Sequence, residues 1–269
     1  MASPRDTFSE LLEKIRSNDK TLVNLNLAGP TFGVQNGLLD YCLPSFKVIK
    51  LCQALLENNV VTSLNLSRNG LNNISAQYIA EMLINDTRCH LTELNLSCNA
   101  IEDAGAYAIS QALEENNTLE VLNLEENEIE KEGANDLAKS LAFNKKLKSL
   151  NLSYNPDLGL DAATKAAKEF GNSLAVNNHL VSLNLFMSSF LPESEELIKA
   201  GCEKSTSLES CKMDSEEWKR SKAKKVPGEV VQVQEEAKPE VNHNRYFFRK
   251  RKHNIISESH APAKNLHRN

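Results

Sequence analysis

Leucine and asparagine return along this chain in one fixed order. The fullest copy runs from Leu91 to Ile101 and reads Leu-x-x-Leu-Asn-Leu-x-x-Asn-x-Ile. Seven copies, some of them incomplete, have their fourth positions at Leu25, Leu64, Leu94, Leu122, Leu150, Leu183 and Cys211. These positions lie 39, 30, 28, 28, 33 and 28 residues apart. The spacing indicates a repeat of 28 residues that is lengthened by insertions at three points.

Each copy predicts a short strand followed by a helix. The Leu-Asn-Leu alternation is typical of a strand. It predicts parallel strands centred on residues 24–26, 63–65, 93–95, 121–123, 149–151, 182–184 and 210–212. After Asn99, the residues Ala106, Ile109 and Leu113 follow at spacings that place them on one face of a helix. We expect the small residues at the start of the helices, as in Gly105-Ala106 and Gly133-Ala134, to let each helix lie close to the strand layer.

A single strand and helix cannot bury an apolar face alone, so the units must stack. We therefore expect an α/β solenoid of about seven repeats, a horseshoe with parallel strands on its concave face and helices on its convex face. The motif resembles the ribonuclease-inhibitor-like subfamily of leucine-rich repeats, over roughly residues 7–214. That subfamily includes inhibitors, GTPase activators, actin-capping proteins and immune-sensor domains, so the resemblance implies the fold and leaves the function open.

Three segments are expected along the chain. Residues 1–20 predict an amphipathic capping helix, and residues 21–218 the repeat domain, whose last core layer Trp218 shields. Residues 219–269 lack the repeat and are expected to be a basic, disordered tail. An insertion of 11 residues falls between Ala28 and Ser45. It is either a loop that contacts a partner or a neutral difference in length.

Charge is divided unevenly between the repeats and the tail. Residues 219–269 carry 13 Lys and Arg against 5 Asp and Glu, whereas residues 1–218 carry 18 against 31. The candidate targeting signal is the run Arg249, Lys250, Arg251 and Lys252. Two alternatives remain open. The run binds nucleic-acid phosphates while residues 246–248 stack on bases, or it lies against the acidic repeats and masks them. Nucleic acid is expected as a partner only at this tail.

The sequence contains no recognisable catalytic or metal-binding motif. Its six histidines and six cysteines are scattered, and it has no glycine-rich phosphate loop and no HExxH. We expect no enzymatic activity, no cofactor, no metal and reduced cysteines. No apolar stretch is long enough to span a membrane, and we expect no membrane contact. Asn-Leu-Ser sequons at Asn65, Asn95 and Asn151 lie in expected strands, where glycans would obstruct packing. This favours the cytoplasm, with the nucleus as a second location.

The candidate partner-binding residues are those expected on the concave face and at its edge. They are Glu93, Glu125, Glu126 and Phe186. The two glutamates after the fourth strand begin an acidic run that either attracts a basic partner or simply faces water. Phe186, with Met187 beside it, either packs under the C-terminal cap or is an exposed anchor.

One asparagine recurs on the same face in the middle of the Leu-Asn-Leu triplets. The row reads Asn26, Asn65, Asn95, Asn123, Asn151 and Asn184. It is either a polar binding surface or a structural row in which stacked amides hydrogen-bond one another. We favour the structural interpretation.

The leading hypothesis is a non-enzymatic intracellular scaffold or adaptor, a monomer that binds a protein partner whose identity the sequence does not give. Two alternatives share the repeat. The segments 15–19 and 22–27 are similar to the start of the repeat domain in tropomodulins, which cap actin pointed ends. This resemblance implies a cytoskeletal regulator. The same repeats also build GTPase-activating proteins that act on Ran, although their tail is acidic and this one is basic.

Overall fold

A computed structural model describes residues 7–29, 43–84, 90–155 and 163–220 of the chain. All of them belong to the first of its two compact units, Met1–Lys222. The helices in these residues are α1 (Thr7–Arg16), α2 (Ser45–Leu55), α3 (Asn73–Ile84), α4 (Asp103–Glu115), α5 (Lys131–Phe143), α6 (Ala163–Val176) and α7 (Pro192–Lys204). Each follows a strand except α1, which precedes the first repeat as the sequence predicts.

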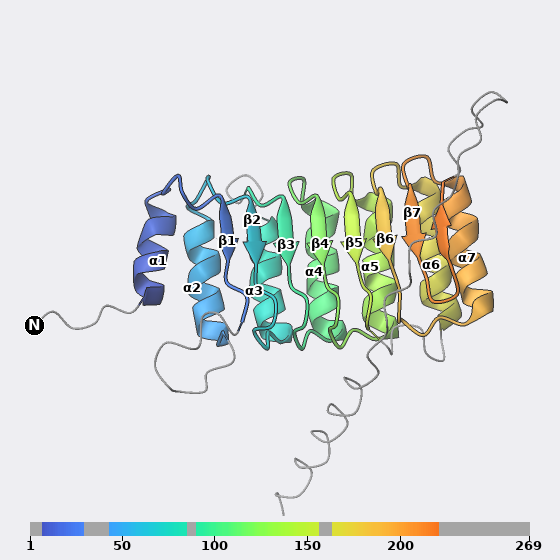
Figure 1. Cartoon of the computed structure of the whole chain (residues 1–269), viewed down its shortest axis with the longest axis horizontal. Helices are drawn as coiled ribbons and strands as arrows, with labels where there is room; N and C mark the ends of the chain where they lie inside the picture. Colours follow the sequence, from blue (N-terminus) through green and yellow to red (C-terminus); the bar gives the residue numbers. More distant parts are fainter. Residues whose placement is uncertain (1–6, 30–42, 85–89, 156–162, 221–269) are drawn as a thin grey trace, which may run out of the picture. The chain divides into compact units, whose positions relative to one another are not determined.

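One sheet holds the strands of this unit in sequence order (Figure 1). The strands are β1 (Asn24–Asn26), β2 (Ser63–Asn65), β3 (Glu93–Asn95), β4 (Val121–Asn123), β5 (Ser149–Asn151), β6 (Ser182–Asn184), β7 (Ser210–Lys212) and β8 (Glu217–Lys219). Strands β1 to β7 are parallel, and the central residue of each, a leucine except for Cys211 in β7, pairs with its repeat equivalent, as Leu94 does with Leu122. The seven predicted strands and their direction are confirmed.

The last strand was not predicted. Strand β8 pairs antiparallel with β7, and Trp218 lies opposite Cys211. This makes the sheet mixed at its C-terminal end, so the expectation of an all-parallel sheet is wrong at that point. Trp218 is half-buried and packs against the core, as expected of a residue that covers the last layer. Only residues 213–216 separate β7 from β8, too few for the helix that a parallel return requires, so the two strands form a short hairpin.

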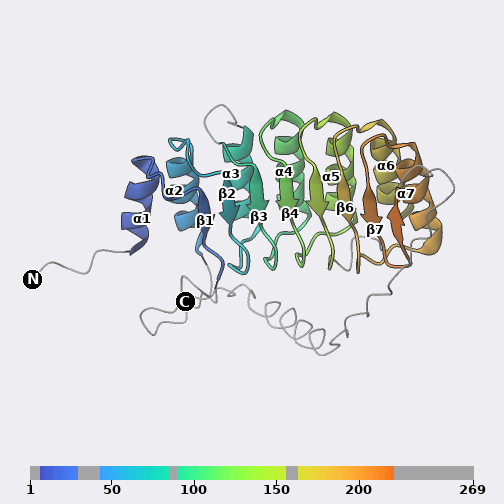
Figure 2. The same ribbon diagram turned by 45° about the horizontal axis from the view of Figure 1, so that its top comes forward.

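Strands and helices form two layers in this unit (Figure 2). Leu122, Leu124, Leu150 and Leu152 are each at most 1% exposed, as predicted. The central residue of each parallel strand is buried, and the residues on either side of it are half-buried or exposed. Since successive strand residues point to opposite sides, the flanking residues form an open surface, here called the strand face.

The glycines at the start of the helices have a different role from the one expected. A Cβ at Gly133 would meet Asp103 Oδ1 at 2.6 Å and Ala106 Cβ at 2.9 Å, both in the preceding helix. Asp103 Oδ1 accepts hydrogen bonds from the N–H groups of Glu130 and Gly133 at 2.8 and 2.9 Å. The glycine therefore lets neighbouring helices approach each other, so that one caps the next. The glycine was expected to bring its helix close to the strand layer, and instead it brings two helices close to each other.

Buried asparagines join consecutive repeats just after the strands. The turn ladder consists of Asn69, Asn99, Asn127 and Asn155. Asn99 Oδ1 accepts from the N–H groups of Asn69 and Leu71 in the preceding repeat, at 2.9 and 3.0 Å. Its Nδ2 lies 2.8 Å from the carbonyl oxygen of Leu96. The ladder satisfies backbone groups that would otherwise be buried without partners.

A second set of asparagines lies where each helix ends. This helix-end ladder consists of Asn58, Asn116, Asn144 and Asn177. Asn144 Nδ2 donates to the Leu113 carbonyl of the preceding helix at 2.6 Å, and its Oδ1 accepts from the N–H of Leu147 at 2.7 Å. This ladder was not predicted from the sequence. Its signal was present, because each member precedes the first aliphatic residue of its repeat by three positions.

Candidate protein-binding surface

The asparagines in the middle of the Leu-Asn-Leu triplets have a structural role, the interpretation that the sequence favoured. Their side chains bond the backbone, however, and not one another. Asn95 Oδ1 accepts from the N–H of Ser97 at 2.9 Å, and Asn123 Oδ1 accepts from that of Glu125 at the same distance. The same bond to the N–H two residues on occurs at the other members of the row. Among the described residues, no hydrogen bond joins two of these amides. The row therefore fixes the backbone where each strand ends.

Glu93 lies in β3, exposed on the strand face. In the sheet register its neighbours are Ser63 on β2 and Val121 on β4. Val121 is 37% exposed, an apolar side chain next to the carboxylate. The predicted exposure of Glu93 on this face therefore agrees with the structure, although the glutamate's role in binding stays a prediction.

Glu125 and Glu126 follow β4 and are only half-buried, since each contacts a neighbouring repeat. Glu125 Oε2 accepts from Asn151 Nδ2 at 3.2 Å. Glu126 Oε2 accepts from Cys98 Sγ at 3.0 Å. Burial, this hydrogen bond and the nearby carboxylate charge raise the pKa of the Cys98 thiol, so the thiol stays protonated. Each of the two glutamates therefore makes a contact within the repeats, and their role in partner binding stays a prediction.

The same turn position has an unusual backbone in five consecutive repeats. The residues with φ between 54° and 61° there are Arg68, Cys98, Glu126, Tyr154 and Met187. A left-handed conformation is costly for side chains other than glycine, asparagine and aspartate. In the first four of these repeats, the left-handed conformation persists because the hydrogen bonds of the turn ladder fix the asparagine that follows it. As a result, five different side chains project at one edge of the strand face.

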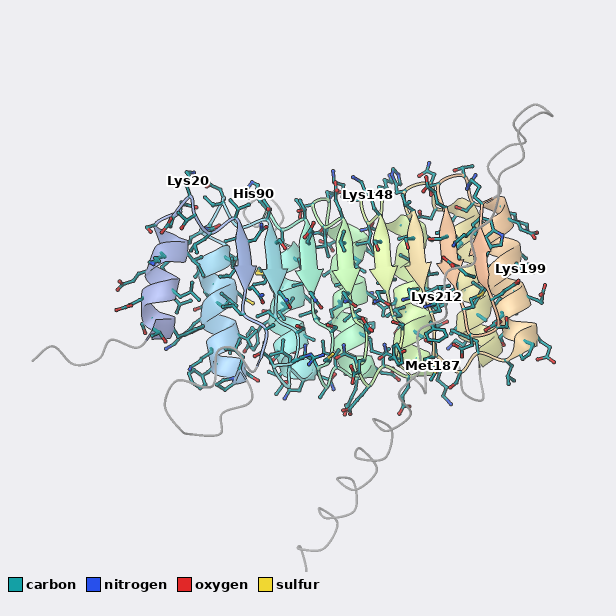
Figure 3. All side chains as sticks on the ribbon, viewed as in Figure 1. Lys20, His90, Lys148, Met187, Lys199 and Lys212 are labelled. Carbon is teal, nitrogen blue, oxygen red and sulfur yellow. The ribbon has the colours of Figure 1, made fainter. Side chains whose placement is uncertain are left out.

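Phe186 lies at the C-terminal end of the strand face and contacts two further residues. Its ring meets that of Tyr154 edge to face, with the centroids 5.8 Å apart and the planes at 84°. Lys212 Nζ lies 4.2 Å from the centroid of the Phe186 ring. Figure 3 places Lys212 and Met187 away from the edge that carries His90 and Lys148. Tyr154 and Lys212 were not predicted as part of a binding surface. Aligning the equivalent positions of the repeats would have placed both residues beside Phe186.

The apolar stretch around Phe186 divides between surface and core. Phe190 is 7% exposed and packs edge to face against Phe170 at 6.4 Å. Leu191 is 59% exposed just before α7, while Phe186 and Met187 are half-buried. Packing under the C-terminal cap is therefore the role of Phe190, and Phe186 keeps an accessible edge.

The C-terminal cap replaces the turn ladder with carboxylates. Ser188 occupies the ladder position in the sixth repeat. The carboxylate of Asp214 accepts from the N–H groups of Met187 and Ser189. Glu195, only 4% exposed, accepts from the N–H of Asp214 and from the hydroxyl of Ser215. These two acids join the turn after β6, α7 and the turn after β7 within the cap.

Among the described residues, no group of three or more His, Cys, Asp or Glu side chains is placed to hold a metal ion. None of the helices in the described part of the chain is long and apolar enough to cross a membrane. The candidate targeting signal at 249–252 and most of the insertion before α2 lie outside the described residues.

A family model for leucine-rich repeats matches residues 57–80, 88–110, 115–138 and 143–164. Tropomodulin-4 from Homo sapiens is 32% identical over 112 residues, which are 42% of this chain and 29% of tropomodulin-4. Leiomodin-2 from Gallus gallus is 34% identical over 112 residues, 42% of this chain and 18% of leiomodin-2. The matched region thus spans less than a third of these relatives.

Two solved structures are similar. Actin-binding site 2 of leiomodin-1 matches with a TM-score of 0.46 and 22% identity, covering 75% of this chain and 92% of that one. The tropomodulin C-terminal domain of Caenorhabditis elegans matches with a TM-score of 0.43 and 13% identity, covering 74% and 93%. The repeated motif, the strand–helix units and the matching family model agree with one another. The chain contains leucine-rich repeats over the matched residues, and their motif resembles that of the ribonuclease-inhibitor-like subfamily.

Proposed function

We propose that this chain is a non-catalytic, intracellular protein-binding domain that binds actin, as a cytoskeletal regulator of the tropomodulin type. The observation that carries the proposal is the 32% identity to tropomodulin-4 over 112 residues. Leiomodin-2 sequences match over the same share of the chain, and tropomodulin-like residues also open the first repeat. The proposal therefore replaces an unspecified protein partner with actin.

The arrangement of the described residues suits a binding role. The strand face is an open surface of small and polar side chains, held by backbone hydrogen bonds, with an aromatic and cationic cluster at one end. Such a rigid surface loses little conformational entropy when a partner docks. The carboxylates and thiols of the turns are occupied by contacts within the repeats.

Co-sedimentation of the full chain with actin filaments tests the proposal. We expect saturable binding that pulls the chain into the pellet as the filament concentration rises. A chain carrying Leu122→Ala and Leu150→Ala, which loses core packing, serves as the control for non-specific trapping. If the unaltered chain stays in the supernatant at every filament concentration, the actin proposal is wrong.

The Ran-directed alternative makes a separate prediction. A GTPase activator would accelerate GTP hydrolysis by Ran, whereas an actin-binding repeat domain would leave the hydrolysis rate unchanged. We expect no acceleration at a concentration of chain that saturates actin filaments. Acceleration that depends on chain concentration would favour the alternative.

For the basic tail we propose a targeting role, carried by the run Arg249 to Lys252. Clustered Lys and Arg attract anionic partners, and screening limits that attraction to about 8 Å at physiological salt. The proposal implies movement of part of the protein into the nucleus, while the repeats bind their partner in the cytoplasm.

A further inference from the structure

Three neighbouring repeats bring Tyr154, Phe186 and Lys212 together at the C-terminal end of the strand face, here called the aromatic–lysine cluster. Elsewhere the same face is built differently. The position of Phe186 is occupied in other repeats by Ala28, Ser67, Ser97, Glu125 and Ser153. The cluster is therefore a local departure from a surface of small side chains.

The cluster is held on a rigid support. Tyr154 donates its backbone N–H to the carbonyl of Phe186 at 2.8 Å. The N–H of Phe186 is bound in turn by Asn184 Oδ1 at 3.1 Å. Lys212 is the last residue of β7, one strand further along the sheet. Each member thus has a fixed backbone, and the rings lose little freedom on binding.

Core packing does not explain the two rings. The aromatic side chains of the nearby core are Phe170 and Phe190, which are 0% and 7% exposed and contact each other. Tyr154 and Phe186 stay half-buried on the other side of the sheet. Aromatic side chains that are rigidly placed and partly exposed are typical of the residues that dominate protein interfaces.

The charge of Lys212 lacks a carboxylate partner within the described part of the chain. Its cross-strand neighbour Glu217 makes its ion pair with Lys219, at 3.0 Å. The carboxylate of Asp214 accepts from the backbone of Met187 and Ser189. The lysine rests on the Phe186 ring, an interaction that attracts a cation and still leaves it accessible to an anion. A partner that brings a carboxylate completes the site.

We propose that the aromatic–lysine cluster is the contact surface for the partner, through a segment that presents a carboxylate beside a bulky apolar side chain. The carboxylate pairs with Lys212, and the apolar group rests on the edges of Tyr154 and Phe186. The inference rests on the proposed function, since it names the surface with which this chain contacts the actin filament.

Two variants of the full chain test the cluster in the co-sedimentation assay. Lys212→Glu reverses the exposed charge, and Phe186→Ala removes the central ring. Each is expected to weaken the affinity for filaments about tenfold or more, as loss of an interface anchor does. Lys212 is exposed, so its variant remains informative even if Phe186→Ala lowers the melting temperature. Thermal melting of both variants shows that they are folded.

Matched controls change the same residue types on the helix layer. Lys168→Glu on α6 and Phe143→Ala at the end of α5, where the ring is 63% exposed, are expected to bind within about twofold of the unaltered chain. If the unaltered chain and both cluster variants bind filaments equally well, the cluster is not the contact surface. The proposal that the chain binds actin would still hold. Failure of the unaltered chain to bind overturns both.

Discussion

At the scale of single residues, buried amides matter as much as leucines. The motif predicted where the leucines pack, and it named the turn asparagines as part of the pattern. It did not reveal that Asn99 bonds two N–H groups of the preceding repeat. Such bonds join residues that are distant in sequence, and a repeat pattern does not give the distance between units. These amides fix the register in which the repeats stack.

Replacing Asn99 by alanine should destabilise the repeat domain strongly. The change leaves the N–H groups of Asn69 and Leu71 buried without their acceptor, at about 1–3 kcal/mol for each unsatisfied group. Urea unfolding followed by circular dichroism measures the loss. Asn178→Ala, at an exposed position before β6, is the control and should change the free energy of unfolding by less than about 0.5 kcal/mol. Equal effects of both variants would contradict the ladder's role.

The thiol of Cys98 should titrate at unusually high pH. Burial comes first among the causes that raise its pKa, followed by the hydrogen bond to Glu126 and that carboxylate's charge. A raised pKa means that the folded chain holds the proton more tightly, so this contribution to stability is present below the usual thiol pKa and is lost at higher pH.

Mass spectrometry of iodoacetamide labelling gives the pH profile of the Cys98 peptide. The midpoint should move to lower pH in Glu126→Gln, because the amide keeps the contact and removes the charge. Glu128→Gln, a nearby carboxylate that is not a cause of the shift, should leave the midpoint in place. An unchanged midpoint in Glu126→Gln would show that burial alone sets the reactivity.

At the scale of elements, the strands were predicted almost residue for residue, whereas β8 and the role of the glycines were not. The period of the leucines determines where each strand lies, so one complete copy locates the others. Strand β8 comes from a single half-buried tryptophan among charged residues, which has no periodicity to detect. The glycine positions were clear, but which neighbour they approach depends on how the helices pack.

Gly201→Ala should destabilise the contact between α6 and α7. A Cβ at Gly201 would lie 2.2 Å from the carbonyl oxygen of Gly171, and both belong to helix backbones that cannot yield easily. Overpacking of this kind costs about 1–3 kcal/mol, which outweighs the better helix propensity of alanine. Urea unfolding measures the change. Ala200→Ser, on the exposed neighbouring position, should cost little, and a Gly201→Ala chain of unchanged stability would mean that the helices are further apart.

At the scale of the whole molecule, the sequence showed how charge is divided between the repeats and the tail. It predicted only some of the residues on the proposed binding surface. Phe186 and Glu93 were expected on the strand face, where they lie. Glu125 and Glu126 also stood among the candidates, but their contacts bind them to Asn151 and Cys98. Tyr154 and Lys212 were missed because their proximity to Phe186 spans three repeats.

Removal of residues 221–269 should leave the melting temperature of the repeat domain almost unchanged. The side chain of Arg220 donates to the carbonyls of Leu208 and Ser205, so the truncation begins after it. The truncated chain should lose its nuclear fraction when cells are imaged by fluorescence. Alanine at each of residues 249–252 is the narrower variant and should have the same effect. Unfolding on truncation would show that the tail belongs to the solenoid.

Fluorescence microscopy of single actin filaments tests most directly whether this repeat domain regulates the cytoskeleton. Growth is recorded separately at the two ends of each filament, with and without the chain. The tropomodulin-like proposal predicts slower elongation at the pointed end as the chain concentration rises, with the barbed end unaffected and Lys212→Glu much less active. Unchanged growth at both ends, at concentrations that saturate the filament in co-sedimentation, would contradict the capping role.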